Sequence, residues 1–160
     1  MSRVIEGEAL RGIAHIVEGA RAEASSSTCS KDHRGAVVFR DRQVLGMATN
    51  GPIYPHGCNP ATCFDVCGLF TMHAERQALV NALADGQDLN GASVLHVRIN
   101  ENEEVQVSGK LRCEDCTGYM ARFLRKGILL KEFILLQEGG WTAYEISEAD
   151  EVTRRNIGLT

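Results

Sequence analysis

Four side chains in two short segments could together hold a metal ion and move a proton. The segment TMHAERQAL places His73 and Glu75 two residues apart in front of a helix-forming run. The segment RCEDC places Cys113 and Cys116 three residues apart. Residues three apart on a helix share one face, so both thiols can reach the same ion. One imidazole nitrogen and two sulfurs make a three-ligand zinc set that leaves the fourth tetrahedral position for water.

Glu75 distinguishes a catalytic zinc site from a structural one. A bound zinc ion brings the pKa of its water towards about 7, and the proton of that water then needs an acceptor. A closed structural site has no use for a carboxylate beside its histidine, whereas a hydrolytic site does. The positive end of a helix dipole would also favour the thiolate form of both cysteines. We therefore expect one catalytic Zn²⁺ held by His73, Cys113 and Cys116, with Glu75 as proton carrier.

The hydrophobic patterns around these segments predict a sheet with helices on both faces. The predicted helices span residues 4–24, 73–85, 113–126 and 146–156, and the predicted strands span 35–40, 44–49, 93–99 and 132–137. The stretch 50–70 holds all three prolines and is expected to be an ordered loop. The unit from 93 to 136 is expected to be a right-handed parallel crossover.

Composition sets limits on the class of protein. A chain of 160 residues with 44% hydrophobic and 24% charged residues is expected to be a single domain over residues 1–160. Its net charge of −4 gives no electrostatic support for binding a polyanion. The start, MSRVIEGEAL, is not typical of a secretory signal, and no apolar stretch reaches the roughly 18 residues of a membrane span. We therefore expect a cytoplasmic protein that does not associate with membranes.

The remaining cysteines leave two interpretations open. Cys58, Cys63 and Cys67 lie in one loop, and Cys29 lies upstream. In a reducing compartment, clustered cysteines are more often metal ligands or free thiols than disulfides. Cys58, Cys63 and Cys67 therefore form either a second, structural zinc site, completed by Cys29, His56 or His33, or a set of thiols that pack as small apolar side chains.

The two motifs, in this order, resemble the signature of the zinc-dependent cytidine and deoxycytidylate deaminase superfamily. That signature is His-x-Glu followed by Cys-x-x-Cys, which HAERQAL and CEDC carry here. The upstream stretch GAVVFRDRQVLGMATNGP resembles the strand pair of that family, and NGP followed by a cysteine is most similar to the deoxycytidylate branch. The resemblance covers about residues 29–136. It implies a three-layer α/β/α cytidine-deaminase-like fold with a central mixed sheet of about five strands.

The resemblance also implies a reaction and further site residues. The reaction is hydrolytic deamination of a cytosine nucleotide or nucleoside, and a dCMP-like substrate is favoured. In this reaction Glu75 shuttles the protons and ammonia is released. Asn50 matches the family's substrate-contacting asparagine, although NGP is also a turn by composition. Backbone groups around Ala74 would help to hold the base. A homo-oligomer is expected by the same resemblance.

Two departures from the family's pattern bear on the substrate. Arg112 stands where the family usually has proline, directly before Cys113. The stretch 100–112 is longer than the direct connection of the simplest members, and alternating Val105 and Val107 predict an added strand or hairpin beside the site. A nucleotide phosphate needs a local cation, for which the candidates are Lys110, Arg112 and Arg34.

Other functions remain as alternatives. The same chemistry suits another base, or a base in single-stranded nucleic acid or tRNA. An aromatic content of 6% and a negative net charge argue against a nucleic-acid partner. A non-catalytic, zinc-stabilised scaffold is the alternative from a different class. His96 is expected to be structural, and Trp141 and Tyr144 to serve packing or subunit contacts.

Overall fold

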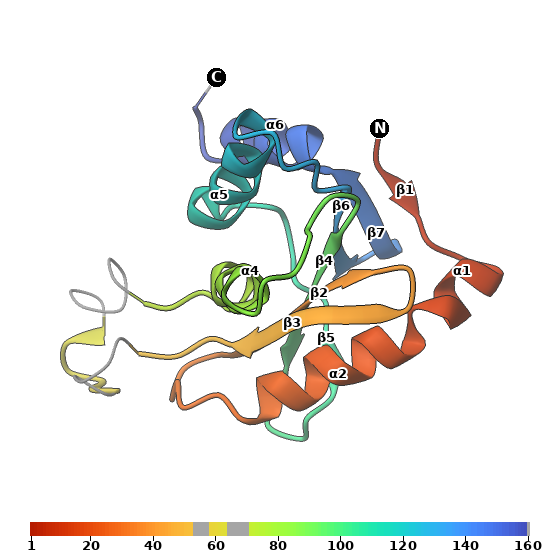
Figure 1. Ribbon diagram of the computed structural model, residues 1–160. Coiled ribbons are helices and arrows are strands. Elements are labelled where there is room, and N and C mark those ends of the chain that lie inside the picture. Colours follow the sequence, from red (N-terminus) through yellow and green to blue (C-terminus); the bar gives the residue numbers. More distant parts are fainter. Residues whose placement is uncertain (53–57, 64–70, 160) are drawn as a thin grey trace.

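The computed structural model describes residues 1–52, 58–63 and 71–159, which contain one seven-stranded sheet and the helices that cover it (Figure 1). The strands are β1 (Arg3–Val4), β2 (His33–Arg40), β3 (Gln43–Thr49), β4 (Ser93–Ile99), β5 (Val105–Gln106), β6 (Glu132–Gln137) and β7 (Gly140–Glu145). The helices are α1 (Gly7–Gly12), α2 (Ala14–Ser25), α4 (Ala74–Ala84), α5 (Glu114–Arg125) and α6 (Ile146–Asn156).

The sheet is mixed, as predicted. Its strand order is β1-β7-β6-β4-β2-β3, and β5 pairs with β4. β2 runs antiparallel to both β3 and β4, while β4 and β6 are parallel and are joined through α5. The predicted parallel pairing of the strands before and after α5 is therefore confirmed.

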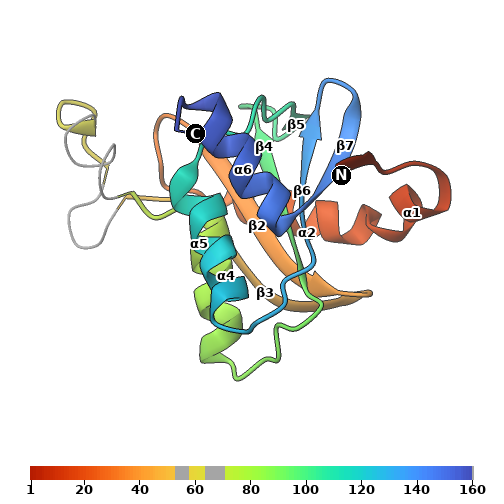
Figure 2. The same cartoon turned by 90° about the horizontal axis from the view of Figure 1, so that it is seen from above.

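Helices cover both faces of the sheet, which confirms the three-layer arrangement. α2 packs along β2 and β4 on one face, and α4 packs on β3 and β2 from the other (Figure 1). α5 contacts α4 and α6 on that second face (Figure 2). The alternation along β2 explains the two layers: Val37 and Phe39 belong to the core on the α2 side, and Ala36 and Val38 to the core on the α4 side.

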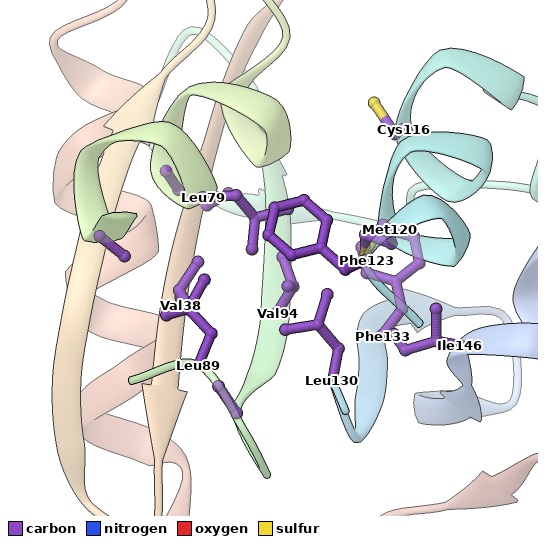
Figure 3. Close-up of a cluster of buried hydrophobic side chains, with 14 of the residues drawn as sticks. Val38, Leu79, Leu89, Val94, Cys116, Met120, Phe123, Leu130, Phe133 and Ile146 are labelled. Atoms are coloured by element: carbon purple, nitrogen blue, oxygen red, sulfur yellow. The ribbon is translucent and has the colours of Figure 1, made fainter. Parts of the chain in front are cut away.

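The core on the α4 side joins the two helices that carry the motifs. Leu79 from α4 and Phe123 from α5 meet Val94 of β4 in this cluster (Figure 3). Cys116 lies at the edge of the cluster, and its sulfur points away from the aliphatic and aromatic side chains (Figure 3). The packing of these side chains fixes the position of α4 relative to α5.

Two glycines let helices approach the sheet closely. At Gly46 of β3, an added Cβ would lie 2.6 Å from the carbonyl oxygen of Ala78 and 2.8 Å from the Cβ of Ala82, both in α4. At Gly35 of β2, an added Cβ would overlap the carbonyl oxygen of Ala20 in α2. The sheet therefore holds α2 and α4 by backbone contact at these points.

The helix predicted over 4–24 is wrong in its first part. Arg3–Val4 form β1, which pairs with β7, and the following helix breaks at Ile13 into α1 and α2. Gly7 has φ 59, a left-handed conformation, and Ile13 has φ −102 and ψ 1. The low helix propensity of Gly7 and Gly12 favours this interruption.

The sheet has seven strands rather than about five, because β1 and β7 were not predicted. β7 begins at Gly140, whose φ is 117, and runs antiparallel to β6. Trp141 packs against the core on the α2 side, and Tyr144 donates a hydrogen bond of 2.7 Å to Gln137 Oε1. Both aromatic residues serve packing, as expected. The strand expected within 100–112 is present as β5.

Among the described residues, the helices are too short or too polar to span a bilayer.

Candidate metal and active site

A short backbone pairing brings the end of β3 next to the start of α4. The N–H of Gly51 donates to the carbonyl of Met72 at 3.1 Å, and the N–H of Met72 donates to the carbonyl of Gly51 at 3.0 Å. His73 follows as the N-cap residue of α4, with φ −79 and ψ 138. The extended backbone at His73 leaves its imidazole at the tip of the helix.

The start of α5 supplies the two sulfurs. Cys113 is the N-cap residue of α5, and Cys116 lies in its first turn with 2% of its surface exposed. The Sγ atoms of Cys113 and Cys116 are 3.1 Å apart. His73 Nδ1 lies 3.4 Å from Cys113 Sγ and 3.3 Å from Cys116 Sγ. The structure therefore brings the three predicted ligands together across two helix tips.

The donor set fits a zinc ion. Zinc prefers sulfur and imidazole ligands, and the ligand atoms of a tetrahedral zinc ion lie roughly 3.6–3.8 Å apart. A small outward movement of these three side chains would accommodate one ion. Within the described residues, His73, Cys113 and Cys116 are the group of potential ligands whose donor atoms lie within 4.8 Å of one another.

One of the two thiols, Cys113, loses its proton easily, and the other, Cys116, keeps it. The hydrogen bond between the two sulfurs lowers the pKa of Cys113 to about 6 and raises the pKa of Cys116. The hydrogen bond of His73 with Cys113 raises the pKa of His73. The site is therefore ready to exchange protons for a cation, because metal ligation requires thiolates and a neutral imidazole.

Glu75 is buried beside this group, with 7% of its surface exposed. Its Oε2 lies 3.4 Å from Cys116 Sγ, and its Oε1 lies 3.5 Å from His96 Nε2. Burial raises the pKa of the Glu75 carboxyl, but His96, a backbone hydrogen bond and His73 outweigh it, so the pKa lies below its ordinary value. Glu75 is therefore a carboxylate at neutral pH, with one oxygen on the side of the metal ligands.

His96 is the residue that sequence reasoning missed. It was expected to be structural, but its ring is 2% exposed and contacts Glu75 from the sheet. Burial lowers the pKa of His96 most, and the nearby Glu75 carboxylate partly opposes this. A signal was present, since His96 shares strand parity with Val94, whose side chain faces α4.

Asn50 holds the loop before β2. Its amide oxygen accepts hydrogen bonds from Ser27 Oγ at 2.8 Å and from the N–H of Arg34 at 2.9 Å. Its amide nitrogen donates to the carbonyl of Asp32 at 2.9 Å. One N–H of Asn50 remains for another acceptor, so contact with a substrate stays a prediction. Ala74 is the first residue of α4 and is 1% exposed, and the role of its backbone also stays a prediction.

The second metal site stays a prediction. Cys29, Cys58 and Cys63 are half-buried free thiols, and Cys67 lies outside the described residues. Ser30 Oγ lies 2.9 Å from Cys58 Sγ, a contact that lowers the pKa of Cys58. The described part of the chain does not gather these cysteines into a group of three ligands.

The candidate cations differ in their surroundings. Arg34 forms an ion pair of 2.6 Å with Asp32, and its Nη1 lies 3.4 Å from His96 Nε2. Lys110 and Arg112 are exposed on the segment that leads into Cys113. A third arginine, Arg76, stacks over the ring of Tyr119 at 4.9 Å and so connects α4 with α5.

No protein-family model and no curated protein sequence matches the chain. Among solved structures, dCMP deaminase from the cyanophage S-TIM5 in complex with dCMP and dUMP is similar, with a TM-score of 0.55 and 19% identity over 88% of this chain and 88% of that chain. Cytidine deaminase from Burkholderia pseudomallei is similar with a TM-score of 0.57 and 18% identity over 85% of this chain and 94% of that chain. The resemblance inferred from the two motifs is confirmed at the level of the fold. The chain has the cytidine-deaminase-like fold of the cytidine and deoxycytidylate deaminases.

Proposed function

We propose that the protein is a zinc-dependent hydrolytic deaminase of a cytosine nucleotide or nucleoside, with a dCMP-like substrate favoured. The convergence of His73, Cys113 and Cys116 beside the buried carboxylate of Glu75 carries this proposal. The likeness in fold to a dCMP deaminase and a cytidine deaminase supports it. The roles of the individual residues are part of the proposal.

When bound, a zinc ion lowers the pKa of a water molecule towards about 7. Glu75 Oε2 would take a proton from the attacking water and pass it to the ring nitrogen next to the amino-bearing carbon, while the water oxygen forms a bond to that carbon. Glu75 would then take the remaining proton of that oxygen and pass it to the amino group. The C–N bond would break, ammonia would leave, and the carbon would keep the oxygen as a carbonyl. One water is consumed, one C–N bond breaks, and Glu75 ends as the carboxylate with which it began.

The phosphate of a nucleotide would be bound by the segment before α5. Lys110 and Arg112 are exposed there, next to Cys113. Arg34 already forms an ion pair with Asp32. We therefore assign the phosphate to Lys110 and Arg112, and their charge would act mainly on the KM for nucleotides.

The chain is also proposed to be a single domain and to form a homo-oligomer in the cytoplasm. β3 lies at the edge of the sheet, and Val44 and Met47 of β3 are exposed near Val80 and Leu83 of α4. A hollow of about 460 Å³ lined by Val44, Met47 and other residues lies at the far end of α4 from the metal ligands. Light scattering of the purified protein measures its oligomeric state.

Two other functions predict different results. A deaminase of another base would release ammonia from a different substrate, or from a single-stranded oligonucleotide or a tRNA. A non-catalytic scaffold would bind zinc and release no ammonia at all. The negative net charge and low aromatic content favour a free nucleotide over a nucleic acid.

The proposal is tested by ammonia release from the zinc-loaded protein. The substrates are cytidine, deoxycytidine, their monophosphates, guanine, adenosine, a single-stranded oligonucleotide and a tRNA. We expect turnover with the cytosine compounds and the highest kcat/KM with dCMP. Turnover of another base alone would overturn the assignment of the substrate, and no turnover in the whole panel would overturn the assignment as a deaminase.

A further inference from the structure

We propose that His96 and Ser108 are positioning residues that hold the Glu75 carboxylate by a chain of hydrogen bonds from behind the site. The inference rests on the proposed function, since it assigns the partner of the proton carrier. Two contacts carry the inference: Ser108 Oγ is within hydrogen-bond distance of Nδ1 of His96, and Oε1 of Glu75 lies 3.5 Å from Nε2 on the other edge of the ring.

The imidazole of His96 lies between two polar groups at its opposite edges. Nδ1 of His96 lies 3.3 Å from Ser108 Oγ, and Nε2 lies 3.5 Å from Glu75 Oε1. The ring of Phe133 lies near the imidazole, with centroids 6.5 Å apart. The ring is fully enclosed, so its orientation is fixed by these neighbours.

Two groups compete for Nε2 of His96, and one of them must be its hydrogen-bond partner. Arg34 Nη1 lies 3.4 Å away and would donate to an unprotonated nitrogen, whereas Glu75 Oε1 lies 3.5 Å away and would accept from a protonated one. The guanidinium of Arg34 is already paired with Asp32, and its side chain is one-third exposed. Leaving the buried carboxylate oxygen of Glu75 without a donor costs more than leaving Arg34 to Asp32 and water.

The hydrogen bonds therefore have one direction. Ser108 O–H donates to Nδ1, and Nε2–H donates to Glu75 Oε1. Burial lowers the pKa of the imidazole most, and the charge of Arg34 lowers it further against the opposing charge of Glu75, so the ring is neutral at neutral pH. A neutral ring supports the carboxylate without neutralising it, so Glu75 keeps its capacity to accept a proton.

This arrangement gives the stretch 100–112 a specific role. β5 pairs with the last residues of β4, and the N–H of Ser108 donates to the carbonyl of Leu136 at 2.8 Å. The backbone contacts on both sides place Ser108 against His96. The segment that follows β5 thus carries the group that fixes the tautomer of His96, as an outer hydrogen-bond partner does for a functional histidine.

The two carboxylate oxygens of Glu75 therefore have different neighbours. Oε1 of Glu75 is held by His96, and Oε2 lies on the side of Cys116 and the other metal ligands. A carboxylate held by one oxygen presents the other in a fixed direction, which successive proton transfers to the ring nitrogen and to the amino group require.

Kinetics of two His96 variants separate a positioning role from a structural one. His96→Leu removes both hydrogen bonds, and His96→Gln keeps an amide that can donate to Glu75. We expect His96→Leu to lower kcat roughly 10- to 100-fold with little change in KM and with zinc content unchanged, and His96→Gln to restore part of kcat. Equal losses in both variants, or an unchanged kcat in His96→Leu, would overturn the proposal.

Ser108 provides a variant with little risk to folding, because it lies in a partly exposed segment. Ser108→Ala should lower kcat about 3- to 10-fold, the value of one hydrogen bond, while Ser108→Thr keeps the hydroxyl and should stay near the wild type. Identical kcat values for the wild type and Ser108→Ala would exclude Ser108 from the chain of hydrogen bonds.

The ¹⁵N resonances of His96 test the chain without any turnover. In the zinc-loaded protein, we expect Nε2 to carry the proton and Nδ1 to be unprotonated, and we expect Ser108→Ala to populate the other tautomer. A proton on Nδ1 in the wild type would overturn the inference. If the chain of hydrogen bonds is seen but no substrate reacts, the proposed function has failed and the positioning of Glu75 has not.

Discussion

The carboxylate of Glu75 is buried, with 9% of the side chain exposed. Burial of a charge is unfavourable unless donors and nearby positive charge compensate it. Here the compensation comes from His96 on one side and from the metal ligands on the other, through the contact with Cys116. The same contacts that make the charge tolerable also orient it.

The lowered pKa of His96 predicts a pH effect on stability. Below about pH 6.5 the unfolded chain takes up a proton at His96, and the folded protein does not, so His96 lowers the free energy of unfolding as the pH falls. Above that pH neither state is protonated, and the effect vanishes. Between pH 7.5 and 5.5, His96→Gln should lose less stability than the wild type, by at most about 1.4 kcal/mol.

Denaturant titration at both pH values measures this difference. His15→Gln is the matched control, because His15 is an exposed histidine of α2. Between the two pH values, His15→Gln should lose as much stability as the wild type. Equal losses of stability in the wild type and His96→Gln would contradict a neutral, buried His96.

The residues of the metal group could be predicted from sequence because their spacing is local. His73 and Glu75 are two residues apart, and Cys113 and Cys116 are three apart, so each pair is positioned by its own helix tip. The contact of His96 with Glu75 could not be predicted in this way. It depends on which helix covers which face of β4, and that is decided by packing of distant segments.

At the scale of elements, the closeness of α4 to β3 decides where His73 and Glu75 lie. The backbone contact at Gly46 sets this distance, and the pairing of Gly51 with Met72 anchors the start of the helix. A change that pushes α4 outwards should therefore affect the metal site, although Gly46 lies outside the group of ligands.

Gly46→Ala tests this coupling. The added methyl group would meet the backbone of α4, so we expect a loss of about 1–3 kcal/mol in the free energy of unfolding and a weaker affinity for zinc. Gly139→Ala is the control, because nothing lies within 4 Å of its added Cβ. Calorimetry and zinc titration measure both quantities. A fully stable Gly46→Ala protein with unchanged zinc affinity would contradict this role of the β3–α4 contact.

Most of the elements were predictable, but β1 and β7 were not. The apolar run of β4 and the helical pattern of α6 gave boundaries that the structure confirms. β1 has only two residues, and β7 begins at Gly140, directly after Gly139, and has no long apolar run. Such strands form because a neighbouring edge is available, which the local sequence does not encode.

At the scale of the whole molecule, the metal group joins segments that are 40 residues apart in the chain, from His73 to Cys113. A ligand that binds only the folded state stabilises it by mass action, by about 2.7 kcal/mol at a hundred times its Kd. Zinc should therefore act as a bridge between α4 and α5 as well as a cofactor.

Removal of the metal should lower the melting temperature. We expect treatment with a chelator to reduce the Tm by roughly 5–10 °C, and added zinc to restore it. Differential scanning calorimetry with metal analysis measures the effect. About one zinc per chain supports a single site, and about two supports the additional cysteine site. A Tm unaffected by chelation would contradict the bridging role.

The most direct test of the central claim compares the wild type with Glu75→Gln, using ammonia release from dCMP and zinc content measured on the same samples. The account predicts that Glu75→Gln keeps about one catalytic zinc per chain and loses roughly 10²- to 10⁴-fold in kcat. Glu101→Gln, which changes an exposed glutamate, should behave as the wild type. A Glu75→Gln protein that binds zinc and still releases ammonia at the wild-type rate would contradict the account.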